Sequence, residues 1–361
     1  MDWKSKLQEW ISSLIKWVTR RRHQSRQFLL TGGVIVVGTL GGGLTFGVDG
    51  SAGALNLRGM ITTSDGLPLW ALVVAFCVGI ALVIAGACMS WTDWSTSRAH
   101  VSRSAVIVLE LRGLVDTSDR PLLQSIPSRL PGQRLDALID VRGDMEAGVI
   151  QRAFDEISGI RDLVQRLRGS REKNHVELVV AGVLQLPLLF YTGVLLDDEG
   201  RLTPLDWDRK VGRWRELDAL DDGEAFSVSG MEQVPPDADE VVIAVSASYQ
   251  TDSVAIAATF SDRPVVSLSL ARPLPDTLWS EAKQAALSAQ FLSISAQLGN
   301  QGTRRIALVL AAPSSLAIRM GRAYDRRNLP EIACFHYERG ATPPYPWSVC
   351  IGPKNARLMT T

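Results

Sequence analysis

The sequence predicts a helical transmembrane hairpin followed by an α/β domain made of two similar halves with mostly parallel sheets. Three observations support this prediction. Two long uncharged apolar runs occur in the first hundred residues, apolar strands alternate with helices from about residue 105, and this alternation repeats at a shift of 128 residues. At 361 residues, the chain is long enough for a membrane module and two soluble halves.

The composition limits which partners the chain can have. The formal net charge is zero, which gives no electrostatic reason to expect a duplex nucleic acid partner. The four cysteines are too scattered for a disulfide framework, and no Cys/His spacing fits a metal. We therefore expect no metal site and no cofactor, in a reducing compartment.

The two apolar runs cover residues 28–48 and 67–92, and neither contains a charge. Because about 20 apolar residues span a bilayer as a helix, residues 27–94 are predicted to form a two-helix transmembrane hairpin. The short polar stretch Asp49–Gly66 would join the two spans. Basic residues before the first span and after the second place both termini in the cytoplasm. A cleaved secretory signal at the first run, with Ala52–Ala54 as the cleavage site, is the alternative.

Residues 1–26 are predicted to form a basic amphipathic helix before the first span. Their apolar residues recur at spacings of three and four, which places them on one helical face. Tryptophans on that face and lysines beside it favour a helix in the membrane interface, and a short coiled-coil seam is the alternative. The face consists of Trp3, Leu7, Trp10, Leu14 and Trp17.

Glycines fill seven of the seventeen positions in residues 31–47, TGGVIVVGTLGGGLTFG. A phosphate-binding Walker loop is excluded because no lysine occurs between Lys16 and Lys173. Small residues four apart let helices approach closely in lipid, either within one hairpin or between subunits around a pore. The predicted packing residues are Gly38, Gly42, Gly43 and Gly47 on the first span, with Ala75 and Gly79 offering a similar face on the second.

The soluble part divides into a first half at about 100–230 and a second half at about 238–361, separated by the charged spacer 217–239. Strands are expected at 105–111, 176–183, 202–207, 240–247, 305–311 and 332–337. Helices are expected at 148–168, 188–196, 279–298 and 315–326. Alternation of this kind implies parallel sheets covered by helices.

The repeat appears when VELVVAGVLQLPLLFYTG is placed over RIALVLAAPSSLAIRMG, with Gly193 on Gly321. At this shift helix falls on helix without a gap, and Leu202–Trp207 falls on Pro330–Phe335. The helix that begins near Ile150 falls near Leu278. Few residues are identical between the two halves at this shift, so the repeat is a repeat of the strand and helix pattern.

Parallel sheets bind ligands at the carboxyl ends of their strands, so two such halves would present these ends to one shared cleft. The loops concerned are 182–187, 246–252 and 312–315. The last opens a helix, where free N–H groups either attract an anion or are capped by a side chain. The predicted ligand-binding residues are Gln185, Ser246, Ser248, Tyr249, Gln250, Pro313, Ser314, Ser315 and Arg319.

The segment AAPSSLAIRMGRAYDRRNLPEIACFHYERG, followed by YPWSVCIG, resembles the carboxyl end of SAVED domains. Ala317 and Gly321 match the small residues of the family's helix. AGVLQLPLLFYTGVLLDDEGRLTPLDWDRKVGRWREL is similar to the matching element of the first half, including Trp207 and Trp214. The resemblance covers about residues 100–355 and rests on the whole pattern, with no catalytic motif.

The resemblance implies two fused Rossmann-like (CARF-like) halves that sense a cyclic di- or trinucleotide in the antiphage systems called CBASS. Tyr249 would stack on a base and Arg319 would pair with a phosphate. Ligand would drive homo-oligomerisation, and the fused helices would disrupt the bacterial inner membrane and kill the infected cell. Both termini would then be cytoplasmic, and the lipid bilayer would be a partner.

The sequence leaves two alternatives open. One is a constitutive membrane scaffold whose soluble part binds a protein. The other is a metal-dependent nuclease with the triplet Asp208-Arg209-Lys210, although Asp206 and Asp208 would share one strand face as at a solvated edge. We expect no enzyme and no catalytic residues.

Overall fold

The computed structural model describes residues 24–40, 44–51, 54–61 and 69–360. The chain forms two compact units, residues 1–100 and 101–361, and each is described by itself. The predicted amphipathic helix at residues 1–26 lies almost wholly outside the described residues.

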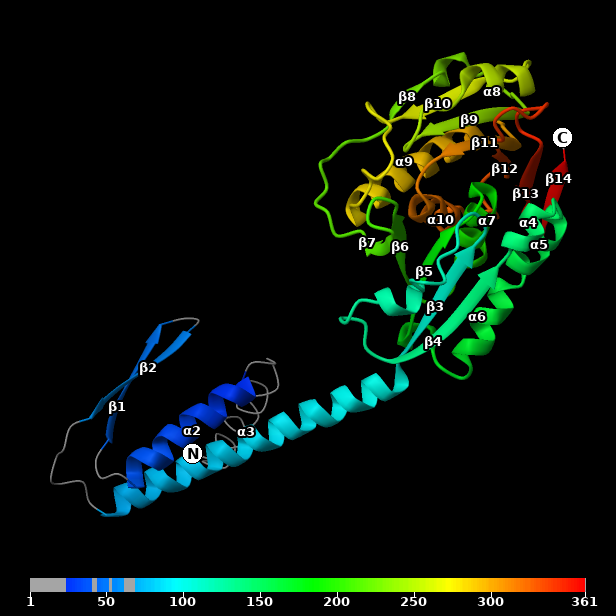
Figure 1. Ribbon diagram of the computed structural model, residues 1–361. Helices are drawn as coiled ribbons and strands as arrows, with labels where there is room; N and C mark the ends of the chain where they lie inside the picture. The colour runs from blue at the N-terminus through cyan, green and yellow to red at the C-terminus, as the bar shows by residue number, and fades with distance from the viewer. Residues whose placement is uncertain (1–23, 41–43, 52–53, 62–68, 361) are drawn as a thin grey trace. The chain divides into compact units, whose positions relative to one another are not determined.

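The described residues of the first unit form two helices and a β-hairpin between them in the chain (Figure 1). Helix α2 covers Gln24–Leu40 and helix α3 covers Leu69–Arg103. Within α3, Val73–Trp91 is long and apolar enough to cross a membrane, whereas the apolar part of α2, Gln27–Thr39, is shorter. Large apolar side chains of both helices are exposed, among them Val37 and Trp70. Such a surface suits a lipid environment.

The first apolar run does not form one helix over residues 28–48, which corrects the prediction. Strand β1 covers Leu44–Ser51 and pairs with β2, Ala54–Ile61. The predicted polar loop is therefore largely a hairpin.

Helices α2 and α3 approach each other closely at Gly32 and Gly79. A Cβ atom on Gly32 would lie 2.7 Å from the Gly79 oxygen, and one on Gly79 would lie 2.9 Å from Val36 Cγ2. Gly38 is buried in α2 and Gly47 lies in β1 rather than on a helix. Gly42 and Gly43 lie outside the described residues. The role of these four glycines in packing between spans stays a prediction.

The second unit begins with a five-stranded sheet in the order β4-β3-β5-β6-β7. The first four strands are parallel, and β7 is antiparallel to β6. Fully buried β3 lies inside the sheet, as expected of a continuous apolar run. The strands are β3 (Ala105–Arg112), β4 (Gln133–Asp140), β5 (Val176–Val183), β6 (Arg201–Asp208) and β7 (Arg213–Glu216).

The second sheet has seven strands in the order β14-β13-β12-β11-β9-β10-β8. Its four central strands are parallel, but β8, β13 and β14 are antiparallel, so the prediction of a mostly parallel sheet is only partly right here. At one edge, β12, β13 and β14 follow one another as hairpins, which need no crossover helix, and at the other edge β8 pairs with β10. The strands are β8 (Ser227–Ser229), β9 (Glu240–Ser246), β10 (Val265–Ser269), β11 (Arg305–Ala311), β12 (Glu331–His336), β13 (Trp347–Ile351) and β14 (Ala356–Thr360).

Seven α-helices accompany the two sheets in the described part of this unit. The predicted helix 148–168 is divided at Gly159 into α5 and α6. Short 3₁₀ helices occur at Leu122–Ser125, Lys173–His175 and Met231–Gln233. The α-helices are α4 (Arg142–Glu146), α5 (Ile150–Ser158), α6 (Ile160–Arg168), α7 (Leu186–Leu195), α8 (Ser253–Thr259), α9 (Glu281–Asn300) and α10 (Ser314–Ala323).

The two halves repeat one topology. Strands β10-β9-β11-β12-β13 have the same order and senses as β4-β3-β5-β6-β7. The structure therefore agrees with the repeat that the sequence pattern predicts.

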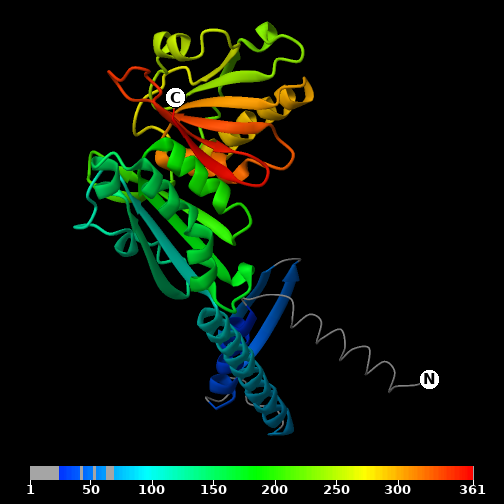
Figure 2. The ribbon, with the colours of Figure 1, turned by 90° about the vertical axis from the view of Figure 1, so that its right-hand side faces the viewer.

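Helices α7 and α10 are equivalent in this repeat and pack against each other between the sheets (Figures 1 and 2). A Cβ atom on Gly193 would lie 2.1 Å from the Ile318 oxygen, and one on Gly321 would lie 1.9 Å from the Phe190 oxygen. At the shift of 128, Gly193 corresponds to Gly321 and Phe190 to Ile318. The contact is therefore symmetric, as at a two-fold interface.

One hydrophobic core runs through both halves. Its buried residues come from strands of both sheets and from α7, α9 and α10, all in one cluster. The rings of Phe190, Phe291 and Tyr324 meet near its centre, with centroids 6.0 to 6.4 Å apart. Because these residues belong to different halves, neither half has a complete core alone.

Candidate functional site

A cavity of about 670 Å³ lies where parallel strands of both sheets end. Its lining includes residues at or just after the ends of β5, β6, β11 and β12, and of the loop that follows β9. This is the shared cleft that the repeat predicts, and carboxyl strand ends are the usual place for ligands in such sheets. The volume falls within the range of small-molecule sites.

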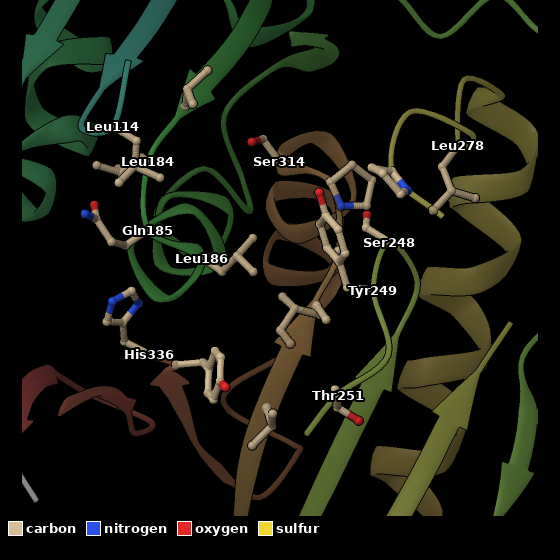
Figure 3. A pocket seen from close by; sticks show the side chains of 18 of the residues that line it. Leu114, Leu184, Gln185, Leu186, Ser248, Tyr249, Thr251, Leu278, Ser314 and His336 are labelled. Atoms are coloured by element: carbon tan, nitrogen blue, oxygen red, sulfur yellow. The ribbon is translucent and has the colours of Figure 1, made fainter. Parts of the chain in front are cut away.

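Six of the nine predicted ligand-binding residues line this cavity. Gln185 and Pro313, the residues just before α7 and α10, are equivalent at the shift of 128. Figure 3 shows Gln185 on one side of the cavity and Ser248 on the other, with the Tyr249 ring between them. The six are Gln185, Ser248, Tyr249, Gln250, Pro313 and Ser314. Their contact with a ligand stays a prediction.

The other three predicted residues do not line the cavity. The Ser246 hydroxyl accepts a hydrogen bond from the Thr251 backbone N–H at 3.1 Å, which closes the loop after β9. Ser315 is fully buried. Arg319 pairs with Glu281 at 3.2 Å instead of pointing to the cavity.

Asp206 closes the N-terminus of α10. The Ser315 backbone N–H and hydroxyl donate to its Oδ2 at 3.1 and 2.7 Å. The expectation of a solvated edge at Asp206 and Asp208 is therefore wrong, because both residues are 8% exposed. Burial raises the pKa of Asp206. The structure shows no ordinary cap from the residues of this helix start, because Pro313 precedes α10 without a side-chain capping hydrogen bond, and a carboxylate from the first half accepts from Ser315 instead.

Two arginines supply positive charge to the cavity lining. Arg209 follows β6 and donates to the Tyr249 hydroxyl at 3.2 Å, and Arg339 follows β12. The carboxylate of Asp252 caps α8 and accepts from the Tyr337 hydroxyl at 3.2 Å. The lining also contains Asp206, Asp252 and Asp276, so the two arginines are its groups suited to an anionic ligand.

His336 and Gln185 contribute neutral polar groups. The His336 ring stacks on Trp347 with centroids 4.8 Å apart, and burial lowers its pKa, so the imidazole is neutral near pH 7. Gln185 is 7% exposed, and its Oε1 accepts no hydrogen bond from the described residues. A buried acceptor of this kind is ready for a donor on a ligand.

Sequence reasoning missed the residues contributed by β6 and β12. The predicted loops follow β5, β9 and β11, but the same strand-end rule applied to Leu202–Trp207 and Ile332–Tyr337 would also have identified Arg209, His336 and Tyr337. Asp206 carries no comparable signal, because its partner Ser315 is 109 residues away. Among the described residues, no three His, Cys, Asp or Glu side chains gather in a way that could hold a metal ion.

Comparison with known proteins finds two family models that match the chain. Residues 160–351 match the family model described as "SMODS-associated and fused to various effectors sensor domain", SAVED. Residues 4–154 match the model "SAVED-fused 2TM effector domain". No curated protein matches the chain.

Solved structures of two receptors are similar to the chain. The Acinetobacter baumannii Cap4 SAVED/CARF-domain containing receptor, solved with the cyclic trinucleotide 2'3'3'-cAAA, is 11% identical with a TM-score of 0.46, over 78% of this chain and 58% of that one. The Moraxella osloensis Cap4 receptor is 11% identical with a TM-score of 0.44, over 78% and 56%. The chain thus spans under two thirds of each receptor. It belongs to the SAVED family, with a 2TM effector domain before the sensor domain.

Proposed function

We propose that this chain is a membrane-bound antiphage effector that binds a cyclic di- or trinucleotide in the SAVED domain. The cavity at the strand ends of both halves is the observation that carries the proposal. It combines two arginines for phosphates with the exposed aromatic ring of Tyr249 for a base. The A. baumannii receptor was solved with a cyclic trinucleotide, and the proposal extends that ligand class to this chain.

Binding would drive self-association, and association would bring the N-terminal helices together in the bacterial inner membrane. The membrane-length segment Val73–Trp91 and the match to a 2TM effector domain support this step. In this proposal the chain has no catalytic residues and needs no cofactor beyond its activating ligand. Clustered helices disrupt the membrane, and the infected cell dies. Both termini would face the cytoplasm, as the basic flanks indicate.

The binding step is tested with the full chain in lipid nanodiscs, titrated with a panel of cyclic di- and trinucleotides. We expect Arg209→Ala to weaken the best binder at least about tenfold, because a hydrogen bond from a charged group to a phosphate contributes about 1.5–3 kcal/mol. Arg166→Ala is the matched control, since Arg166 is exposed on α6 outside the cavity lining. No binding by any panel member, or equal losses in both variants, would contradict the site.

The effector step is tested with the same chain in dye-loaded liposomes. Addition of the best-binding panel member should release dye from liposomes that contain the chain, and the Arg209→Ala chain should need more of it. Tight binding without dye release would support the alternative of a membrane scaffold.

A further inference from the structure

The side chain of Gln185 is buried in the cavity lining, and its carbonyl oxygen is unpaired. Gln185 is 7% exposed, and no donor among the described residues hydrogen-bonds to its Oε1. A buried polar atom without a partner destabilises a fold. The glutamine is therefore present at a cost to stability, which a hydrogen bond to a bound ligand would offset.

The connection between β5 and α7 does not need this amide. Gln185 is the residue before α7, and its side chain makes no capping hydrogen bond to the helix. At the shift of 128 the equivalent residue is Pro313, which has no amide side chain and directly precedes α10. The same strand-to-helix connection thus forms with proline in one half. The structural role of the position does not explain the amide in the other half.

The backbone on both sides holds Gln185 in place. Its carbonyl oxygen accepts from the N–H groups of Leu188 and Leu189 at 3.0 and 3.2 Å. Two residues earlier, the Val183 carbonyl oxygen accepts from the Gly113 N–H at 3.0 Å. A Cβ atom on Gly113 would lie 3.2 Å from Gln185 Oε1, so the glycine leaves room for the amide. The amide is therefore positioned before a ligand arrives, which lowers the cost of binding.

The neighbouring polar group on this side of the cavity is also uncharged. Figure 3 shows Gln185 and His336 on one side, with Ser248 and Thr251 on the other. A neutral imidazole offers one donor and one acceptor, as the amide of Gln185 offers both kinds of group. Uncharged groups of this kind match the edge of a nucleobase, and glutamine amides pair with a donor and an acceptor on one base. A phosphate is better matched by a guanidinium such as that of Arg209.

We propose that Gln185, together with His336, reads the hydrogen-bonding edge of one base of the ligand and so determines which bases the sensor accepts. This inference rests on the proposed function and adds its specificity. Oε1 accepts from an amino or ring N–H group of the base, and Nε2 donates to a ring nitrogen or oxo group. Arg209 binds phosphate whatever the base, and stacking on Tyr249 tolerates any base.

The test measures discrimination between bases by the full chain in lipid nanodiscs. The best binder of the panel is compared with the same ring carrying unsubstituted purine at every base position, because this base stacks but has no exocyclic hydrogen-bond group. The unmodified chain should bind the substituted ring at least about fivefold more weakly. In Gln185→Met, which has a similar shape and no amide, this ratio should fall below about twofold.

Two further variants separate base reading from other roles. Arg209→Ala should weaken both ligands and keep the ratio, because phosphate contacts carry no information about the base. Gln185→Asn keeps the amide but withdraws it by one methylene group, and it should also lower the ratio. An unchanged ratio in both Gln185 variants overturns base reading and leaves the proposed function standing. If no member of the panel binds the unmodified chain, the proposed function and base reading both fall.

Discussion

Asp206 shows at the residue scale how the cavity is held together. It lies on β6 of the first half, yet its carboxylate accepts both hydrogen bonds from Ser315 of the second half. The aspartate thus fixes the wall of the cavity by joining the two halves. In the proposed function, Arg209 and Arg339 are the cationic groups of the lining that an anionic ligand would meet.

Replacement of Asp206 tests this role. Asp206→Ala leaves the buried Ser315 N–H and hydroxyl without their acceptor, so the free energy of unfolding of the soluble unit should fall by about 2 kcal/mol. Asp206→Asn keeps an acceptor oxygen and should lose less than half as much. Urea unfolding followed by tryptophan fluorescence measures both. Equal losses would mean that the negative charge, rather than the acceptor, stabilises the contact.

At the scale of secondary-structure elements, the close crossing of α7 and α10 is the contact that joins the two halves. Gly193→Ala would place a methyl group 2.1 Å from the Ile318 oxygen, which forces the helices apart. We expect a loss of about 3 kcal/mol in the free energy of unfolding. Gly143→Ala is the matched control, because a Cβ atom there meets nothing within 4 Å, and it should stabilise by up to about 1 kcal/mol. An unchanged midpoint for Gly193→Ala would contradict the close crossing.

The contact of α2 with α3 gives a second prediction at this scale. Gly32→Leu should disrupt the packing against Gly79, whereas Gly33→Leu should not, since a Cβ atom on Gly33 meets nothing within 4 Å. Dye release from liposomes should therefore fall in the first variant alone. Nucleotide affinity should stay the same in both, because both glycines belong to the first unit. Equal release would show that the helices need not pack closely.

At the scale of the whole sensor unit, the shared core predicts one cooperative unfolding transition. The largest cluster of buried residues includes strands of both halves, and two smaller clusters belong to one half each. Native-state hydrogen exchange should give the most protected amides of β5 and β11 the same opening free energy, within about 1 kcal/mol. Gly193→Ala should lower both values together. Early exchange of one half alone would show that the halves are independent domains.

By itself the sequence determined the features that depend on local pattern. Uncharged apolar length identified the second span, and periodicity identified the strands and helices of the repeat. The shift of 128 placed Gly193 on Gly321, the pair that meets in the structure. Strand-end loops then located six residues of the cavity, because the carboxyl ends of parallel strands must share one edge of a sheet.

Only the tertiary structure decided contacts between residues far apart in the chain. The cap of Ser315 by Asp206 crosses 109 residues, and no local pattern carries that information. The antiparallel edge strands depend on which neighbour is free to pair, and the β1–β2 hairpin depends on cross-strand register. An apolar run of membrane length can form a helix or strands. The backbone hydrogen bonds are satisfied within one segment in a helix and between two segments in a hairpin, and amino-acid composition does not distinguish these two cases.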